Sequence, residues 1–286
     1  MPDHPTQSPI PHWAGLPLTA PLVMGILNVT PDSFSDGGLY LEPSAAIERG
    51  LQLAEEGADI IDVGGESTRP GAQPVSLKEE LRRVLPVITA LVERVSVPLS
   101  IDTSKAVVAR EALAAGVQIV NDVTALRGDP TMLEVVTEFQ PGVCLMHMRG
   151  TPQTMQQQAV YQDVVEEVRG FLRERCEALK KAGIPEEKLA IDPGLGFAKT
   201  PQHNWQIIGS IQRFRELGYP LVVGHSRKRF IREITGAEAR KVIEGTLGVS
   251  LLLAAAGVDI LRIHDVEITR RLLDWLRKES KPEPDV

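Results

Sequence analysis

Eight short apolar runs divide the chain at regular intervals. They begin at Leu22, Asp59, Pro98, Ile119, Gly142, Leu189, Pro220 and Ile260. Their starts recur about every 34 residues, a spacing typical of a repeated unit of one strand and one helix. Because the runs are nearly continuous rather than alternating, we expect both faces of each strand to be buried, as in a parallel sheet.

Amphipathic helical patterns fill the intervals between these runs. Apolar residues recur every three to four positions in residues 44–56, 77–93, 105–115, 131–139, 162–182, 204–217, 240–256 and 267–278. Eight strand–helix units predict an α/β protein with a single (β/α)8 TIM barrel over residues 21–279, and an open doubly wound sheet is the alternative. The Pro-rich extension, residues 1–20, and the tail, residues 280–286, are expected to be frayed ends.

Polar residues gather where the apolar runs end. They are Asn28, Asp62, Asp102, Asn121, Asp122, His147, Asp192, Ser226, Lys228, Arg262 and His264. Charge in a buried strand is costly unless it is paired or used, and barrels of this kind carry their active sites at the carboxyl ends of the strands. The pattern therefore predicts a site there. For Asp122 and Ser104 helix capping is an equally good interpretation, and for Asp62 we favour support of neighbouring groups over ligand contact.

Cations follow the last two strands. Arg262 and His264 are two apart, so their side chains emerge on one face, next to Ser226, Arg227 and Lys228 after the preceding strand. Barrels often bind phosphate at this position, so we expect a substrate with a phosphate or diphosphate group.

An amide and several carboxylates complete the polar set. The amide oxygen of Asn28 could hold a hydrated Mg²⁺ that bridges a diphosphate, although a structural role at a turn is nearly as plausible. Asp102, Asn121 and Asp192 could ligate a metal with His147, or could accept the N–H groups of a heterocycle.

We favour the heterocycle, because one carboxylate accepts two N–H bonds at once. Lys228 could then donate to a ring carbonyl and keep the aspartates ionised. Met146 and Phe197 could stack on a flat ring, although core packing is the simpler interpretation for methionine. The long polar stretches 28–38 and 64–71, after the first and second strands, are typical of mobile lids.

Composition narrows the choice of function. A net charge of −7 argues against charge-driven binding to nucleic acid. No apolar stretch approaches the roughly 18 residues needed to cross a bilayer. The amino terminus lacks the pattern of a secretory signal, and the two cysteines have no metal-ligand or redox spacing, so we expect a cytoplasmic protein without disulfides or membrane contact.

Several motifs resemble one enzyme family. In chain order they are NVTPDSFSDGG, DVGGESTRPGA, LSIDTSK, NDV, CLMHMRGTP, IDPGLGFAKT, GHSRKRF and LRIHDV, and they resemble dihydropteroate synthase from about residue 22 to residue 266. The resemblance implies a (β/α)8 barrel that joins 6-hydroxymethyl-7,8-dihydropterin diphosphate to p-aminobenzoate. The products would be 7,8-dihydropteroate and diphosphate, Mg²⁺ would assist, and the enzyme would be a homodimer and a target of sulfonamides.

The resemblance also implies roles for single residues. Those that read the pterin would be Asp102, Asn121, Asp192 and Lys228, with Met146, Phe197 and Arg262 lining the ring. Those around the diphosphate would be Asn28, which would also bind Mg²⁺, Arg262, His264 and Arg69. Those that shape the p-aminobenzoate pocket with Lys228 would be Phe34, Asp36, Thr68 and Pro70. Asp36 and Asp102 would stabilise a developing cation. The chain departs from the family at Arg229, where many relatives carry Ser, and at Ala198, where Gly is frequent.

Two other functions remain open from the sequence. A methyltetrahydrofolate-binding methyltransferase domain shares the carboxylates that read the pterin, but it needs neither the cation cluster nor these loops. A pterin-binding protein without catalytic activity would keep the same motifs. Release of diphosphate that depends on p-aminobenzoate would distinguish the synthase from both.

Overall fold

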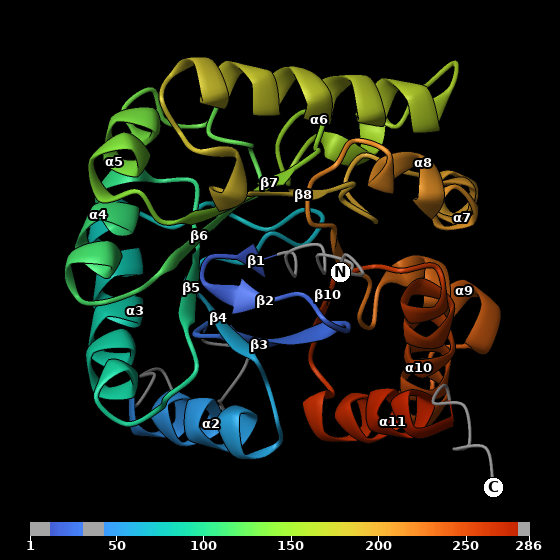
Figure 1. Cartoon of the computed structure of the whole chain (residues 1–286), viewed down its shortest axis with the longest axis horizontal. Coiled ribbons are helices and arrows are strands. Elements are labelled where there is room, and N and C mark those ends of the chain that lie inside the picture. Colours follow the sequence, from blue (N-terminus) through green and yellow to red (C-terminus); the bar gives the residue numbers. More distant parts are fainter. Residues whose placement is uncertain (1–11, 31–42, 280–286) are drawn as a thin grey trace, which may run out of the picture.

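Eight parallel strands form a barrel in the computed structural model, which describes residues 12–30 and 43–279 (Figure 1). The strands are β3 (Leu22–Asn28), β4 (Ile60–Gly64), β5 (Leu99–Asp102), β6 (Ile119–Asp122), β7 (Gly142–Met146), β8 (Leu189–Asp192), β9 (Val222–Gly224) and β10 (Ile260–Ile263). Each predicted apolar run contains one of them. Their near-continuous burial agrees with a parallel sheet that is covered on both faces.

The strand order identifies the architecture. It runs β8-β7-β6-β5-β4-β3-β10-β9, and β8 and β9 at its two ends meet through a bridge between Ile191 and Leu221. The backbone N–H of Ile191 also donates to the carbonyl of Pro220 at 2.9 Å. The sheet therefore comes close to closing on itself, which confirms the barrel and excludes the open doubly wound sheet.

Helices surround the barrel as an outer ring (Figure 1). They are α2 (Pro43–Glu55), α3 (Leu77–Val92), α4 (Ala106–Ala114), α5 (Met132–Phe139), α6 (Val164–Lys181), α7 (Pro201–Gly209), α8 (Ile211–Arg215), α9 (Arg229–Thr235), α10 (Ala239–Ala255) and α11 (Val266–Glu279). Two short 3-10 helices, η1 (Met155–Gln158) and η2 (Glu186–Lys188), lie in loops. The helix predicted over residues 204–217 is divided in two at Ser210, and α9 was not predicted.

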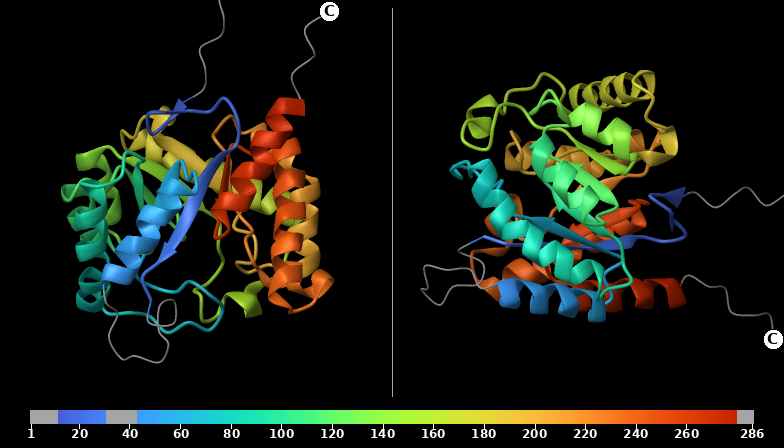
Figure 2. Two further views of the ribbon diagram at one scale, coloured as in Figure 1. Left: turned by 90° about the horizontal axis from the view of Figure 1, so that it is seen from below. Right: turned by 90° about the vertical axis from the view of Figure 1, so that its left-hand side faces the viewer.

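A small hairpin covers one end of the barrel. It pairs β1 (His12–Trp13) with β2 (Leu16–Pro17), and Figure 2 shows it beside the start of β3. Trp13 is fully buried among inward-facing side chains of the strands, and its Nε1 atom donates to the carbonyl of Lys188 at 2.9 Å. The expectation of a frayed extension is therefore wrong for residues 12–17. Residues 1–11 and the tail, 280–286, lie outside the described residues.

Most of the core lies between the strands and the helices. This outer layer contains Leu27, Ile61, Ile101, Leu145 and Leu261 from the strands and their partners on the helices. Cys144 and Cys176 are buried and free. Along the described part of the chain, no helix is both long enough and apolar enough to cross a bilayer.

Candidate active site

The register of the sheet brings several polar residues to the same level of the barrel. Gly64 pairs with Asn28 on one side and with Asp102 on the other, and Asp102 pairs with Asn121. A Cβ atom on Gly64 would lie 3.7 Å from Asp102 Oδ2 and 3.9 Å from Asn28 Oδ1. Asn28 and Asp102 therefore face one space that the missing side chain of Gly64 leaves free.

Arg262 connects the carboxylates at this level. Its Nε atom donates to Asp62 Oδ2 and its Nη2 atom to Asp102 Oδ2, each at 2.6 Å. Asn121 Nδ2 also donates to Asp62 Oδ2, at 3.0 Å. Asp62 is completely buried, so it orients Arg262 and Asn121 from below, as the sequence interpretation favoured.

Asp192 and Lys228 lie on the other side of Arg262. A Cβ atom on Gly224 would lie 3.7 Å from Arg262 Cδ and 3.9 Å from Asp192 Oδ2, so these side chains share one region of the barrel mouth. Lys228 donates from Nζ to the carbonyl of Leu195, and Nζ lies 4.5 Å from the centroid of the Phe197 ring.

Burial shifts the pKa values of these groups toward neutral pH. It raises the pKa of Asp102 to about 7, although the charge of Arg262 opposes the rise. Burial also raises the pKa of Asp192, against the charge of Lys228. The pKa of Lys228 falls to about 8 because burial disfavours its ammonium form more than Asp192 favours it. Such shifts in a cluster at a barrel mouth are typical of a functional site.

The loop from β8 to α7 is held in an unusual conformation. Gly194, Gly196 and Ala198 have φ values of +68°, +83° and +50°. Asn204 Oδ1 accepts from Gly196 N at 2.7 Å, and Lys199 Nζ donates to the carbonyl of Phe197 at 3.0 Å. Left-handed backbone strains an alanine, so tertiary contacts must hold Ala198 in place.

His147 does not join the carboxylates. Its Nδ1 atom lies 3.0 Å from Lys199 Nζ, and burial together with the charge of Lys199 lowers its pKa to about 2. The possible metal site of Asp102, Asn121 and Asp192 with His147 therefore has no support, and the described residues contain no group of three or more acidic, His or Cys side chains that could hold a metal. Lys199, which is buried, is not identified by the sequence, because a lysine in a polar loop gives no sign of burial.

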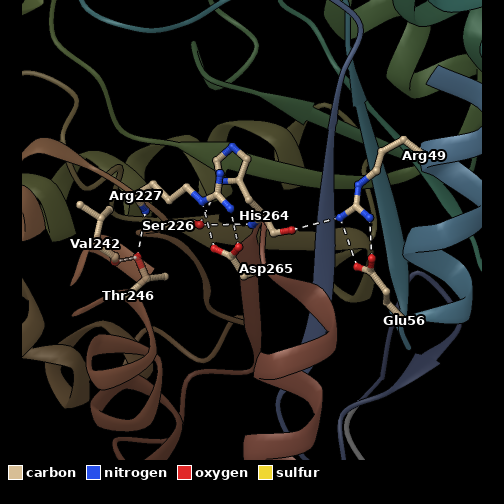
Figure 3. Close-up of polar contacts among 8 residues, drawn as sticks. All are labelled: Arg49, Glu56, Ser226, Arg227, Val242, Thr246, His264 and Asp265. Carbon is tan, nitrogen blue, oxygen red and sulfur yellow. Dashed lines mark hydrogen bonds and ion pairs between the residues drawn. The ribbon is translucent and has the colours of Figure 1, made fainter. Parts of the chain in front are cut away.

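The predicted cation cluster is divided in the structure. Ser226 Oγ lies 2.9 Å from His264 Nδ1, while Arg227 pairs with Asp265 through Nε and Oδ2 at 3.0 Å (Figure 3). Lys228 instead faces Asp192 and Phe197. Arg262 still acts on the charge of Lys228 and on His264, so it links the two parts of the expected cluster.

Positive charge nevertheless surrounds His264. Burial lowers its pKa to about 3, and the charges of Arg227, Arg262 and Arg69 lower it further, while Asp265 opposes them. His264 is therefore neutral at pH 7 and is under the influence of three arginine charges, although Arg227 pairs with Asp265 and Arg262 with two carboxylates. An anion would find guanidinium donors in this region.

The loop after β4 borders a cavity of about 330 Å³. Residues that line it include Thr30, Ser67, Arg69, Pro70, Gln73 and Arg83. The base of the loop is fixed, because Lys105 bonds both Glu66 and the buried Glu80, and Glu80 also accepts from Thr103 Oγ1 at 2.6 Å. Thr68 lies within the loop and is partly buried. Phe34 and Asp36, on the loop after β3, lie outside the described residues.

The remaining candidates have local surroundings. Met146 packs with Met148, Met155 and Ala198 in a small apolar cluster, against which Phe197 lies. Arg229 is 84% exposed and pairs with Glu233 at 2.8 Å. Asp122 accepts from the backbone N–H groups of Thr124 and Leu126 at 2.7 and 3.0 Å.

Asp122 therefore shapes its own turn. At the start of α4, Ala106 N donates to Asp129 Oδ2 at 2.9 Å, and the structure gives no capping bond to Ser104.

Comparison with known proteins gives a consistent result. The family model described as pterin binding enzyme matches residues 24–264. The dihydropteroate synthase of Escherichia coli strain K12 is 45% identical over 254 residues, which cover 89% of this chain and 90% of that protein. The structure of Xanthomonas albilineans dihydropteroate synthase with 4-aminobenzoic acid superposes with a TM-score of 0.89 at 48% identity, covering 96% and 100% of the two chains. The complex of that enzyme with 7,8-dihydropteroate superposes with a TM-score of 0.84 at 46% identity, covering 93% and 97%.

A barrel whose mouth gathers buried carboxylates and cations, matched along most of its length by this family model, is a pterin-binding enzyme. The relatives define its place within that class. At this identity and coverage, the chain belongs to the dihydropteroate synthase family.

Proposed function

We propose that the protein condenses 6-hydroxymethyl-7,8-dihydropterin diphosphate with p-aminobenzoate to give 7,8-dihydropteroate and diphosphate. The proposal rests above all on the contact of Arg262 with Asp62 and Asp102 at 2.6 Å, because it places a guanidinium between the buried carboxylates and the cationic surroundings of His264. The relatives with 4-aminobenzoic acid and 7,8-dihydropteroate support the choice of substrates.

The buried groups would recognise the pterin by its hydrogen-bonding edge. Asp102 and Asp192 are acceptors when ionised and would receive N–H groups of the ring, with Asn121 beside them. Lys228 would donate to the ring carbonyl. Phe197 lies under the ammonium of Lys228 and, with Met146 close by, would contribute an apolar surface to the ring.

The cationic region would hold the diphosphate. Arg262 and Arg69 would pair with its oxygens, and His264 would donate a hydrogen bond. Positive charge at this place stabilises the negative charge that grows on the diphosphate as it leaves.

The donor atoms present fit Mg²⁺ as an assisting ion. Asn28 Oδ1 faces the space above Gly64, and oxygen donors suit this metal; Asp102 Oδ2 borders the same space but accepts from Arg262. Mg²⁺ keeps several waters and binds substrate phosphates readily, so Asn28 would be its main protein ligand. When bound, the ion supplies charge neutralisation on the diphosphate.

The reaction would need no strong general base. The bond between the exocyclic CH₂ and the diphosphate oxygen breaks, its electron pair leaves with diphosphate, and the electron-rich ring delocalises the positive charge. Asp102 and Asp36 would stabilise that cation. The amine of p-aminobenzoate, unprotonated at neutral pH, then forms the new C–N bond and releases its proton to water. Thr68, Pro70 and Phe34 would shape the pocket that holds this second substrate.

The experiment is a diphosphate-release assay with both substrates and Mg²⁺. Release that depends on p-aminobenzoate supports the synthase. Pterin binding without release would favour a non-catalytic protein, and methyl transfer to a corrinoid would favour the methyltransferase. Asp36→Ala should slow single-turnover cleavage of the pterin diphosphate while the pterin still binds, and unchanged cleavage would remove Asp36 from the mechanism.

We also propose a homodimer and a cytoplasmic location. Leu252 on α10 and Trp275 on α11 are 57% and 56% exposed, and these two helices pack against each other. Large exposed apolar side chains on adjacent helices favour an interface. Sedimentation of wild type and Leu252→Asp would test the dimer. Two free buried thiols fit a reducing compartment, which cell fractionation would test.

A further inference from the structure

The hydrogen bonds around Ser226 decide which nitrogen of His264 carries the proton. Ser226 is buried, and its Oγ atom accepts from the backbone N–H of His264 at 3.2 Å. The same Oγ lies 2.9 Å from His264 Nδ1 (Figure 3). The proton in the contact between Ser226 Oγ and His264 Nδ1 therefore belongs either to the hydroxyl or to the ring.

Only one arrangement gives each of these polar groups a partner among the described residues. If Nδ1 carried a proton, the backbone N–H and the Nδ1–H of His264 would both donate to Ser226 Oγ. The hydroxyl proton would then have no acceptor among the described residues. A buried donor without a partner is costly. If Nδ1 is instead unprotonated, the Ser226 hydroxyl donates to it, and Nε2 carries the proton of the neutral ring.

Several contacts hold the backbone around this pair. Arg227 has a φ of +57°, its N–H donates to Thr246 Oγ1 at 3.1 Å, and its guanidinium pairs with Asp265. Arg49 Nη2 donates to the carbonyl of His264 at 3.4 Å (Figure 3). The loops after β9 and β10 are thereby held together, which keeps Ser226 and His264 in contact.

The other ring nitrogen is available to a ligand. Within the described residues, His264 Nε2 makes no hydrogen bond, and Figure 3 shows it on the side of the ring away from Ser226. A proton on Nε2 makes it a donor to a phosphoryl oxygen, whereas an unprotonated Nε2 would repel that oxygen.

We infer that Ser226 is a positioning residue that fixes His264 in the Nε2–H tautomer, so that His264 binds a phosphoryl oxygen as a neutral donor. The inference rests on the proposed function for the identity of the anion. The positive charge at this subsite then comes from Arg262, Arg69 and Arg227. His264 contributes a directional hydrogen bond without a charge.

Nitrogen NMR tests the tautomer without any substrate. The chain has six histidines, so long-range ¹H–¹⁵N spectra of protein labelled in histidine are tractable, and loss of one signal set in His264→Gln assigns the ring. The wild type at pH 7 should show Nδ1 as the unprotonated nitrogen. In Ser226→Ala the signals should move toward a mixture of tautomers, and Ser226→Thr, which keeps the hydroxyl, should restore them.

Binding of inorganic diphosphate gives the second readout. Ser226→Ala should bind it roughly three- to tenfold more weakly, about the loss expected when one hydrogen bond to an anion is weakened, and Ser226→Thr should recover the affinity. The KM for p-aminobenzoate should stay unchanged in both variants, which a general loss of structure would not allow.

Failure of the inference differs from failure of the proposed function. A wild-type His264 protonated on Nδ1, a tautomer unaffected by Ser226→Ala, or unchanged diphosphate affinity in that variant would each overturn the inference even if dihydropteroate forms. Absence of product from wild type would instead overturn the proposed function and leave the tautomer result standing.

Discussion

Asp62 Oδ2 and Arg262 Nε lie 2.6 Å apart in the barrel, although the two residues are separated by 200 positions in the sequence. Asp62 is on β4 and Arg262 on β10, with β3 between them, so the guanidinium reaches across one strand. The pair fixes the direction of Arg262 and leaves its Nη2 atom for Asp102. A group buried beneath the site thus determines where the cation points.

Asp62→Asn should destabilise the fold by roughly 1–3 kcal/mol, because the buried bonds from Arg262 and Asn121 lose their charged acceptor while Arg262 keeps only its pairing with Asp102. Urea unfolding measures the change. Glu244→Gln is the control, since Glu244 pairs with Arg240 on the exposed surface and its loss should cost less than about 0.5 kcal/mol. Equal losses in the two variants would contradict the role assigned to Asp62.

Activity should fall as the pH rises above about 8. Burial lowers the pKa of Lys228 to about 8, so above that pH the side chain loses the charge that would contact the pterin carbonyl. The ratio kcat/KM for the pterin substrate should therefore decrease about tenfold per pH unit on the alkaline side. In Lys228→Arg, which stays charged, this decrease should disappear even though the overall rate is lower.

The same shift changes stability with a definite sign. Between pH 8 and the ordinary lysine pKa of about 10.4, the unfolded chain holds the Lys228 proton and the folded chain does not. Stability from this group therefore rises across that window, and in Lys228→Met the rise should be absent. If the unfolding free energies of wild type and Lys228→Met changed in the same way across this pH window, the shift would be contradicted.

Ala198→Gly should cost little stability. Alanine at a φ of +50° is strained by about 1 kcal/mol, and relief of that strain offsets most of the loss of a buried methyl group. Ala109→Gly is the matched control, because Ala109 is equally buried but lies inside α4, where glycine costs about 2 kcal/mol in all. Thermal melts should separate the two variants by at least about 1 kcal/mol, and identical losses would show that Ala198 is unstrained.

Trp13→Ala should destabilise the barrel by roughly 3–5 kcal/mol, since it removes a fully buried indole from the inner core. Val160→Ala, at a residue that is 74% exposed, should change stability by less than about 1 kcal/mol. Denaturant titrations followed by circular dichroism compare them. A mild effect of Trp13→Ala would mean that the hairpin contributes little to the closed end of the barrel.

Chelation of Mg²⁺ should abolish synthesis but leave the pterin without diphosphate able to bind, because the ion is proposed to act on the phosphates. Asn28→Ala should raise the Mg²⁺ concentration needed for half-maximal rate about tenfold, the loss expected for one protein ligand. Calorimetry with the free pterin alcohol is the control. Full activity in a chelating buffer would contradict a role for the metal.

The strands and the location of the site were predictable because both follow from local pattern. Apolar runs ending in polar residues such as Asp102 and Arg262 identify strands and their carboxyl ends without any knowledge of contacts. The partners of those residues depend on which strands become neighbours. The sequence therefore indicates that Asp62 supports neighbouring groups but does not identify Arg262 as its partner. It also does not indicate the burial of Lys199. Helix α9 has seven residues, too few for a periodic pattern.

The hairpin around Trp13 affects how ligands can enter and leave the barrel. Among the described residues the hairpin plugs one end of the cylinder, so small molecules would enter through the opposite opening. Asp102 and Asn121 are deep in that opening, whereas Arg69 and Pro70 are at its rim. A compound held near Arg69 and Pro70 would therefore lie across the route by which a compound at Asp102 and Asn121 could leave.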